Sequence, residues 1–84
     1  MSESLPLHFI VEVLSPDDRP RLVADKVLEY LAVGVRLVWI IDPESGRGTV
    51  HRADGTTLEI DASGTLDGEG VLPGFECPLA ELLS

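Results

Sequence analysis

Several features that would mark a secreted, disulfide-stabilised or membrane protein are missing from this sequence. It has a single cysteine, Cys77, which excludes an internal disulfide. The first residues lack the charged and apolar segments of a secretory signal, and no apolar run reaches the roughly 18 residues of a membrane span. We therefore expect a cytoplasmic protein without a membrane partner.

Basic residues are also scarce. Six Lys and Arg side chains stand against fifteen Asp and Glu, which gives a net charge of −9 at pH 7. A field of this sign repels nucleic acid and argues against a non-specific DNA-binding module. It argues less strongly against a nuclease, because a nuclease site needs carboxylates to hold a metal ion.

The length of 84 residues is enough for one small domain, and 44% of the residues are hydrophobic. A chain near this size buries only about 60% of its unfolded surface, so its core is thin. Small domains usually add disulfides, metals or further subunits. We expect a homo-oligomer in which self-association covers the apolar first strand.

An apolar run near the start predicts a β-strand over residues 7–14, interrupted only by His8 and Glu12. Side chains alternate between the two faces of a strand, so His8, Ile10 and Glu12 share one face. We expect both faces of this strand to be buried. The Glu12 carboxylate would then point into mostly apolar surroundings.

A helix is predicted next, over residues 18–33. The Ser-Pro-Asp-Asp segment before it supplies turn and N-cap chemistry, and Pro20 is tolerated in a first helical turn. Gly34 is a suitable left-handed stop. A second apolar strand over residues 35–41 follows, and the strand, helix, strand order predicts two parallel strands joined by a right-handed crossover.

The second half of the chain predicts an antiparallel extension of this unit. Residues 49–52 and 56–60 are expected to form a hairpin around the turn at 53–55. The remainder of the chain is rich in glycine and proline, which favour turns. One element is predicted there, a helical turn over residues 78–83. The fold class is α/β, with a crossover unit followed by an antiparallel hairpin.

Three stretches of the sequence carry a resemblance to a known family. They are Val11 to Pro16, then Lys26 with Tyr30 and the segment 34–43, and finally Leu72 to Phe75. Their order and spacing resemble the Uma-two family of restriction-endonuclease-like proteins in the PD-(D/E)xK nuclease class. The resemblance implies a restriction-endonuclease-like core, with residues 1–84 forming its C-terminal portion as a single truncated domain.

The resemblance also implies a site. In that class a strand acid and an earlier aspartate bind a divalent metal and activate water, and a lysine assists. Glu12 matches the acid, which implies that it is a catalytic residue and a metal ligand. The resemblance further implies Mg²⁺ as the cofactor and DNA as the substrate. In the PD-(D/E)xK class the lysine often stands two residues after the acid, where this chain has Leu14. In the Uma-two family the lysine lies on the following helix instead, and Lys26 matches that position.

Some positions depart from the family pattern. The family has another half before this region, including the hairpin that bears the first metal-binding aspartate, whereas six residues precede the predicted strand here. Their sole acid, Glu3, has no matching motif. His8 stands where relatives carry an aspartate, but at about 3.3 Å per residue it lies roughly 13 Å from Glu12 along the strand. We expect an incomplete site unless a second chain contributes.

The candidate residues also have purely structural interpretations. Glu12 would form an ion pair with Lys26 or an arginine beneath the helix, because buried charges persist only when paired. His8 is more often a half-buried histidine with a hydrogen-bond partner than a metal ligand. Tyr30, Trp39 and Cys77 are interpreted as packing residues. His51 and Arg52 on the hairpin are expected to be exposed.

Two functions follow from the sequence. The first is a divalent-metal-dependent DNA endonuclease or its half-site, with Glu12 holding metal and Lys26 assisting the attacking water. His51 and Arg52 on the hairpin are secondary candidates for DNA contact. The second is a non-catalytic oligomerisation or interaction module derived from such a nuclease.

Overall fold

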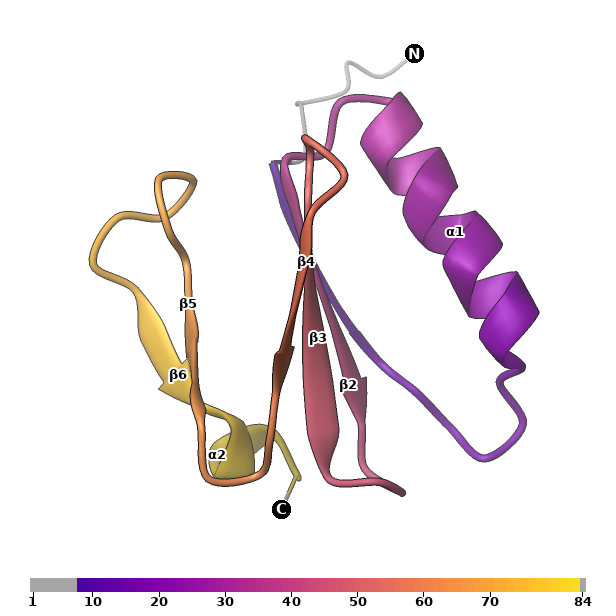
Figure 1. Cartoon of the computed structure of the whole chain (residues 1–84), viewed down its shortest axis with the longest axis vertical. Coiled ribbons are helices and arrows are strands. Elements are labelled where there is room, and N and C mark those ends of the chain that lie inside the picture. Colours follow the sequence, from indigo (N-terminus) through magenta and orange to yellow (C-terminus); the bar gives the residue numbers. More distant parts are fainter. Residues whose placement is uncertain (1–7, 84) are drawn as a thin grey trace, which may run out of the picture.

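A computed structural model describes residues 8–83, which form three layers (Figure 1). A four-stranded sheet lies in the middle, with α1 on one side and a two-stranded ribbon with α2 on the other. In chain order the elements are β1 Phe9–Val13, α1 Pro20–Ala32, β2 Leu37–Asp42, β3 Arg47–Arg52, β4 Thr57–Ile60, β5 Thr65–Asp67, β6 Glu76–Pro78 and α2 Leu79–Leu83. Glu3 and the first residue of the predicted strand lie outside the described residues.

The central sheet has the strand order β1-β2-β3-β4, so β1 and β4 are its two edges. β1 pairs with β2 in parallel and sets Val11 beside Trp39. The other neighbours, β2 with β3 and β3 with β4, are antiparallel. The parallel pair follows from the crossover through α1. The predicted α/β fold, a crossover unit followed by a hairpin, is confirmed.

The helix α1 begins later than the sequence predicts. Its N-cap is Arg19, which makes no side-chain cap, and Pro20 occupies the first turn. Asp18, predicted to lie at the start of the helix, instead accepts a hydrogen bond from the Ser15 backbone N–H at 2.7 Å and closes the preceding turn. The helix ends as predicted before Gly34, whose φ of 102° suits a residue without a Cβ.

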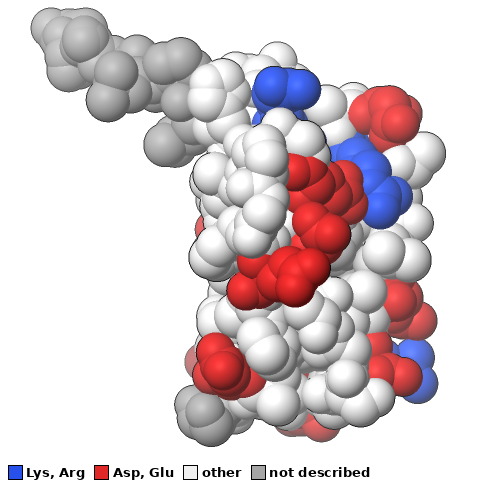
Figure 2. Space-filling model, turned by 90° about the vertical axis from the view of Figure 1, so that its left-hand side faces the viewer, with Lys and Arg blue, Asp and Glu red and all other residues white. Residues whose placement is uncertain are grey.

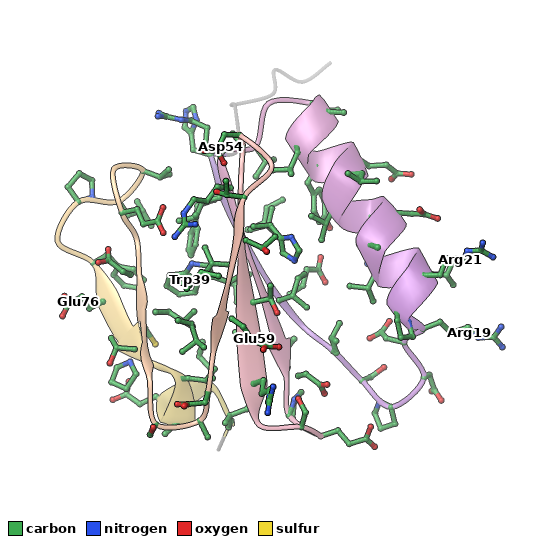
Figure 3. The ribbon with its side chains drawn as sticks, viewed as in Figure 1. Arg19, Arg21, Trp39, Asp54, Glu59 and Glu76 are labelled. Atoms are coloured by element: carbon green, nitrogen blue, oxygen red, sulfur yellow. The ribbon has the colours of Figure 1, made fainter. Side chains whose placement is uncertain are left out.

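The larger buried cluster lies between the sheet and the β5–β6–α2 layer. Trp39 points into this space (Figure 3), with its ring stacked on Phe75 at 5.9 Å and edge-to-face with Phe9 at 4.7 Å between centroids. Leu66 and Leu79 are fully buried in the same cluster. The sequence did not predict β5 and β6, because strands of three residues are too short for an alternating pattern to be recognised.

A smaller cluster lies between α1 and the sheet. Its buried members are Val27, Val35, Val38 and Ile40. These residues hold α1 over β1 and β2, the half of the sheet that includes Glu12. Neither helix formed by the described residues is long and apolar enough to cross a membrane.

The strand β1 is less buried than the sequence predicts. Both of its faces were expected to be covered, yet Val11 is 41% and Val13 is 53% exposed. The prediction was wrong because β1 is an outer strand, and the β5–β6–α2 layer packs on the middle of the sheet and reaches only Phe9 of β1. An apolar run in the sequence does not show which strand lies at an edge.

Candidate active site

Glu12 on β1 contacts two side chains of α1. Its Oε2 accepts a hydrogen bond from the Tyr30 hydroxyl at 2.6 Å, and its Oε1 lies 3.9 Å from Lys26 Nζ. The side chains of Lys26 and Glu12 are 54% and 29% exposed, so this cluster is open to solvent. The structure therefore brings the two predicted site residues together and adds Tyr30 to them.

The local sequence explains this arrangement. Strand alternation puts Glu12 on the same face of β1 as Ile10, which packs under α1. Lys26 and Tyr30 are four residues apart on α1, so they lie one turn apart on the same helix face. The interpretation of Tyr30 as a packing residue missed its bond to Glu12. Its spacing from Lys26 was the signal that could have found it.

The contacts of Glu12 have electrostatic consequences. The pKa of Tyr30 is raised, chiefly because its hydrogen bond to Glu12 favours the protonated phenol; partial burial and the charges of Glu12 and Glu29 act in the same direction. Tyr30 is thus a hydrogen-bond donor at neutral pH and fixes the orientation of the carboxylate. An ion pair as exposed as Lys26 with Glu12 contributes at most about 1 kcal/mol to stability. Stabilising the fold is therefore a minor role for these charges.

Comparisons with known proteins identify the family of this chain. The family model Uma2, described as "Putative restriction endonuclease", matches residues 3–80, which include Glu12 and Lys26. The chain belongs to the Uma2 family. A solved structure from Anabaena variabilis, described as a "putative nuclease belonging to DUF820", is similar with a TM-score of 0.77 and 22% identity, covering 90% of this chain and 43% of that one.

The likeness to the Anabaena variabilis protein establishes the fold. This Uma2 chain spans less than half the length of that protein. A search of curated proteins found no match to the sequence.

The described residues do not contain the full set of metal ligands expected of such a nuclease. Among residues 8–83, no three His, Cys, Asp or Glu side chains form a group that could hold a metal ion. Glu12 offers one carboxylate, and its oxygens contact Tyr30 and Lys26. Mg²⁺ is usually held by one or two carboxylates together with waters and phosphate oxygens. Glu12 therefore suits one ligand position, and the described residues do not form a complete metal centre.

The other predicted candidates lie apart from Glu12. His8 was expected to be half-buried but is exposed. It precedes β1, and its carbonyl accepts hydrogen bonds from the Arg36 and Leu37 backbone N–H groups, both at 3.1 Å. His51 and Arg52 were expected to be exposed but are half-buried. The Arg52 guanidinium is paired with the Glu69 carboxylate at 2.9 Å, so its charge is already matched within the chain.

His51 lines a hollow on the α1 side of the sheet. This hollow has a volume of about 530 Å³ and lies between the first turns of α1 and strands β2 to β4. Thr49 and Glu59 also line it, and Figure 3 shows the position of Glu59. Burial lowers the pKa of His51. Glu12 is not part of the lining, so this hollow is separate from the Glu12 cluster.

Proposed function

We propose that this Uma2 member is a divalent-metal-dependent DNA endonuclease, carried by one domain over residues 1–84. The observation that carries the proposal is the meeting of the β1 carboxylate Glu12 with the α1 ammonium group of Lys26. Membership of a family described as restriction endonuclease supports hydrolysis of phosphodiesters. An enzyme that cuts cellular DNA would work in the cytoplasm.

Each residue of the cluster has a proposed role. Phosphodiester hydrolysis needs charge stabilisation at the phosphate and a water of lowered pKa, which a bound divalent cation supplies. Glu12 would hold one position of Mg²⁺, and water, the phosphate and groups other than residues 8–83 of the same chain would fill its other positions. Lys26 would support the negative charge that develops on the phosphate. Tyr30 would orient Glu12 through the hydrogen bond to Oε2.

The distribution of charge favours approach of DNA from the α1 side. Three of the six Lys and Arg residues, Arg19, Arg21 and Lys26, lie on α1 or at its N-cap, together with the two acidic residues Asp25 and Glu29. Residues 19–32 therefore carry nearly balanced charge in a chain whose net charge is −9. Figure 3 shows Arg19 and Arg21 projecting from the helix into solvent. On the opposite side, the charged residues over the β5–β6 layer are mostly acidic (Figure 2). That side would repel a phosphate backbone.

A second function is favoured by a specific observation. The described residues provide one carboxylate for a metal, and Lys26 already neutralises it. The same contacts therefore fit a non-catalytic oligomerisation or interaction module that keeps the fold of a nuclease without its chemistry.

Cleavage of plasmid and short duplex DNA in Mg²⁺ or Mn²⁺ distinguishes the two functions. We expect Glu12→Gln and Lys26→Ala each to lower the cleavage rate at least about 100-fold, a loss typical of removing one group from a preorganised site. Matched controls are Glu76→Gln, whose side chain lies on the β5–β6 side of the sheet (Figure 3), and Arg36→Ala, which removes an exposed cation outside α1. The controls should cut at the native rate.

The outcomes separate clearly. Loss of cleavage in the two site variants, with both controls active, supports the endonuclease. If purified native protein does not cut, or all five proteins cut alike, the endonuclease proposal fails and the interaction module takes its place.

A further inference from the structure

The outer edge of β1 has no neighbouring strand among residues 8–83. Val11 and Val13 project from one face of this strand and are 41% and 53% exposed. The strand Phe9–Val13 contains no proline, lysine or arginine. Proline and charged residues commonly protect an edge strand from pairing with another chain. The one charged residue of β1, Glu12, is engaged by Lys26 and Tyr30 of α1, so the opposite face of the strand is apolar and its edge is open.

The flank of α1 above this edge also carries exposed apolar side chains. Lys26 reaches Glu12, so its flank of the helix faces the β1 side. Leu22 lies one turn before Lys26 and Val33 lies seven residues after it, spacings that keep both on the same flank. Leu22 and Val33 are 61% and 79% exposed. With Glu29 between them, these residues form a line that we name the α1 stripe: Leu22, Lys26, Glu29 and Val33.

The α1 stripe is complementary to itself when its direction is reversed. Against an antiparallel second copy, Leu22 of one chain meets Val33 of the other, and Lys26 meets Glu29. Apolar groups thus face apolar groups, and each cation faces an anion. A two-fold axis makes every such contact twice. This self-complementarity in charge identifies a second copy of the chain as the partner that fits the surface.

We propose that two copies of this chain pair their β1 strands antiparallel about a two-fold axis and join their sheets. A register centred on Val11 pairs all five residues of β1. It sets Val11 against its own counterpart, Val13 against Phe9, and Glu12 against Ile10. A register centred on Glu12 would set two carboxylates directly opposite each other, which destabilises a sheet.

This pairing also bears on the proposed active site, and that part of the inference rests on the proposed function. Strand alternation keeps both copies of Glu12 on the same face of the joined sheet, at diagonal positions roughly 7–8 Å apart. Glutamate side chains are long enough to bring their carboxylates together across that spacing. The second copy thus supplies the additional carboxylate that residues 8–83 of one chain lack.

Disulfide trapping tests the register. Val11→Cys in a Cys77→Ser background sets two thiols directly opposite each other, within the Cα separation of 4.4–6.8 Å that a disulfide needs. Val13→Cys in the same background is the matched control, because its two copies would be four residues apart along the strands. We expect rapid oxidation to a dimer for Val11→Cys and at least about tenfold slower oxidation for Val13→Cys. Equal rates would overturn the register.

Charge substitutions in the α1 stripe test the contacts between the helices. Leu22→Glu with Val33→Lys creates two opposite-charge contacts across the axis, whereas Leu22→Lys with Val33→Lys creates two repulsive ones. Both pairs change only exposed side chains, and circular dichroism confirms that each variant is folded. We expect sedimentation to show at least a tenfold weaker dimer for the second pair at low salt, a gap that narrows as salt screens the charges. Equal dimerisation of the two pairs would contradict the stripe contact.

Failure of the pairing and failure of the proposed function give different results. Light scattering that shows the unmodified chain as a monomer at high micromolar concentration overturns the pairing, even if the chain cuts DNA. A dimer that is trapped through Val11 but does not cut DNA keeps the pairing and overturns the endonuclease.

Discussion

The two faces of the central sheet differ in what they bury. Toward β5–β6–α2, the core consists of apolar side chains, of which Trp39 and Leu79 are 1% and 0% exposed. Toward α1, the half-buried positions include Glu12, Thr49 and His51, and a hollow lies beside Thr49 and His51. One face therefore holds the fold together, while the other presents groups that can take part in chemistry.

The difference has a structural cause. The apolar cluster beneath α1 reaches β1 and β2, but none of its members comes from β3 or β4. Polar side chains on the α1 side of β3 and β4 therefore face the hollow and not a packed layer. Substitutions on the first face should change stability, and substitutions on the second should change titration and activity without unfolding the chain.

The largest effect is expected at the centre of the apolar face. Trp39→Ala removes a ring that contacts Phe9 and Phe75, and should lower the free energy of unfolding by about 3–5 kcal/mol. Urea unfolding followed by far-ultraviolet circular dichroism measures it. Leu28→Ala is the control, because Leu28 is 64% exposed and its loss should change stability by less than about 0.5 kcal/mol. Similar costs for the two variants would show that Trp39 does not anchor the apolar face of the sheet.

A smaller effect is expected in the turn that connects β5 and β6. A Cβ added at Gly68 would lie 2.5 Å from the Leu72 carbonyl oxygen, so the backbone of this turn would have to move. We expect Gly68→Ala to cost about 1–3 kcal/mol, the range of an overpacked site. Gly70→Ala is the matched control, since its Cβ would meet no atom within 4 Å. If both variants unfold at the same urea concentration, the close approach at Gly68 does not constrain the turn.

The sequence alone was sufficient to predict the long helix and strands of this fold. The run that contains Trp39 and the helical spacing around Lys26 were sufficient for the crossover unit, because each pattern repeats over more than one period. β5 and β6 contain three residues each, and Leu66 gains its burial from contacts with residues far away in the chain. Such contacts leave no local periodicity to read.

The candidate site was predictable to a similar extent. Glu12 and Lys26 follow from the family motif, and their meeting confirms the expected ion pair. Tyr30 was underestimated, since a tyrosine among apolar residues has the same pattern whether or not its hydroxyl finds a carboxylate. The pairing of Arg52 with Glu69 depends on a turn that the sequence did not predict, so no local signal indicated it.

His51 should make stability depend on pH on the α1 side of the sheet. Burial lowers its pKa in the folded chain below the ordinary value of 6.5. As the pH falls below 6.5, the unfolded chain therefore takes up this proton first, and stability is lost until the pH passes the lowered folded value. His51→Gln should reduce the dependence of the urea midpoint on pH in this window. His8→Gln is the control, because His8 is exposed; an unchanged profile for His51→Gln would show that burial of His51 has no such effect.

The smallest effect on stability is expected at the Glu12 cluster, where the titration of Tyr30 can be observed directly. Tyr30 is the single tyrosine, so the near-ultraviolet absorbance of phenolate reports its ionisation alone. Its pKa is raised above 10.0, so the stability gained from its bond to Glu12 is present below pH 10 and is lost as the pH rises further. Glu12→Ala should return the pKa toward 10.0, whereas Glu29→Gln should lower it only slightly, since the Glu29 charge is the weakest of its causes.

The same titration distinguishes a metal ligand from a structural ion pair without measuring cleavage. A divalent cation on Glu12 would compete with the Tyr30 hydroxyl for the carboxylate and place a positive charge beside the phenol. Both changes favour the phenolate, so a bound divalent cation should lower the pKa of Tyr30 in the native chain and leave it unchanged in Glu12→Ala. Ca²⁺ is the cation to use, because Mg²⁺ and Mn²⁺ precipitate as hydroxides in this alkaline range, and K⁺ at equal ionic strength is the control for ordinary screening. A Tyr30 titration that no divalent cation shifts would show that Glu12 is held by its α1 partners and does not bind metal in this chain.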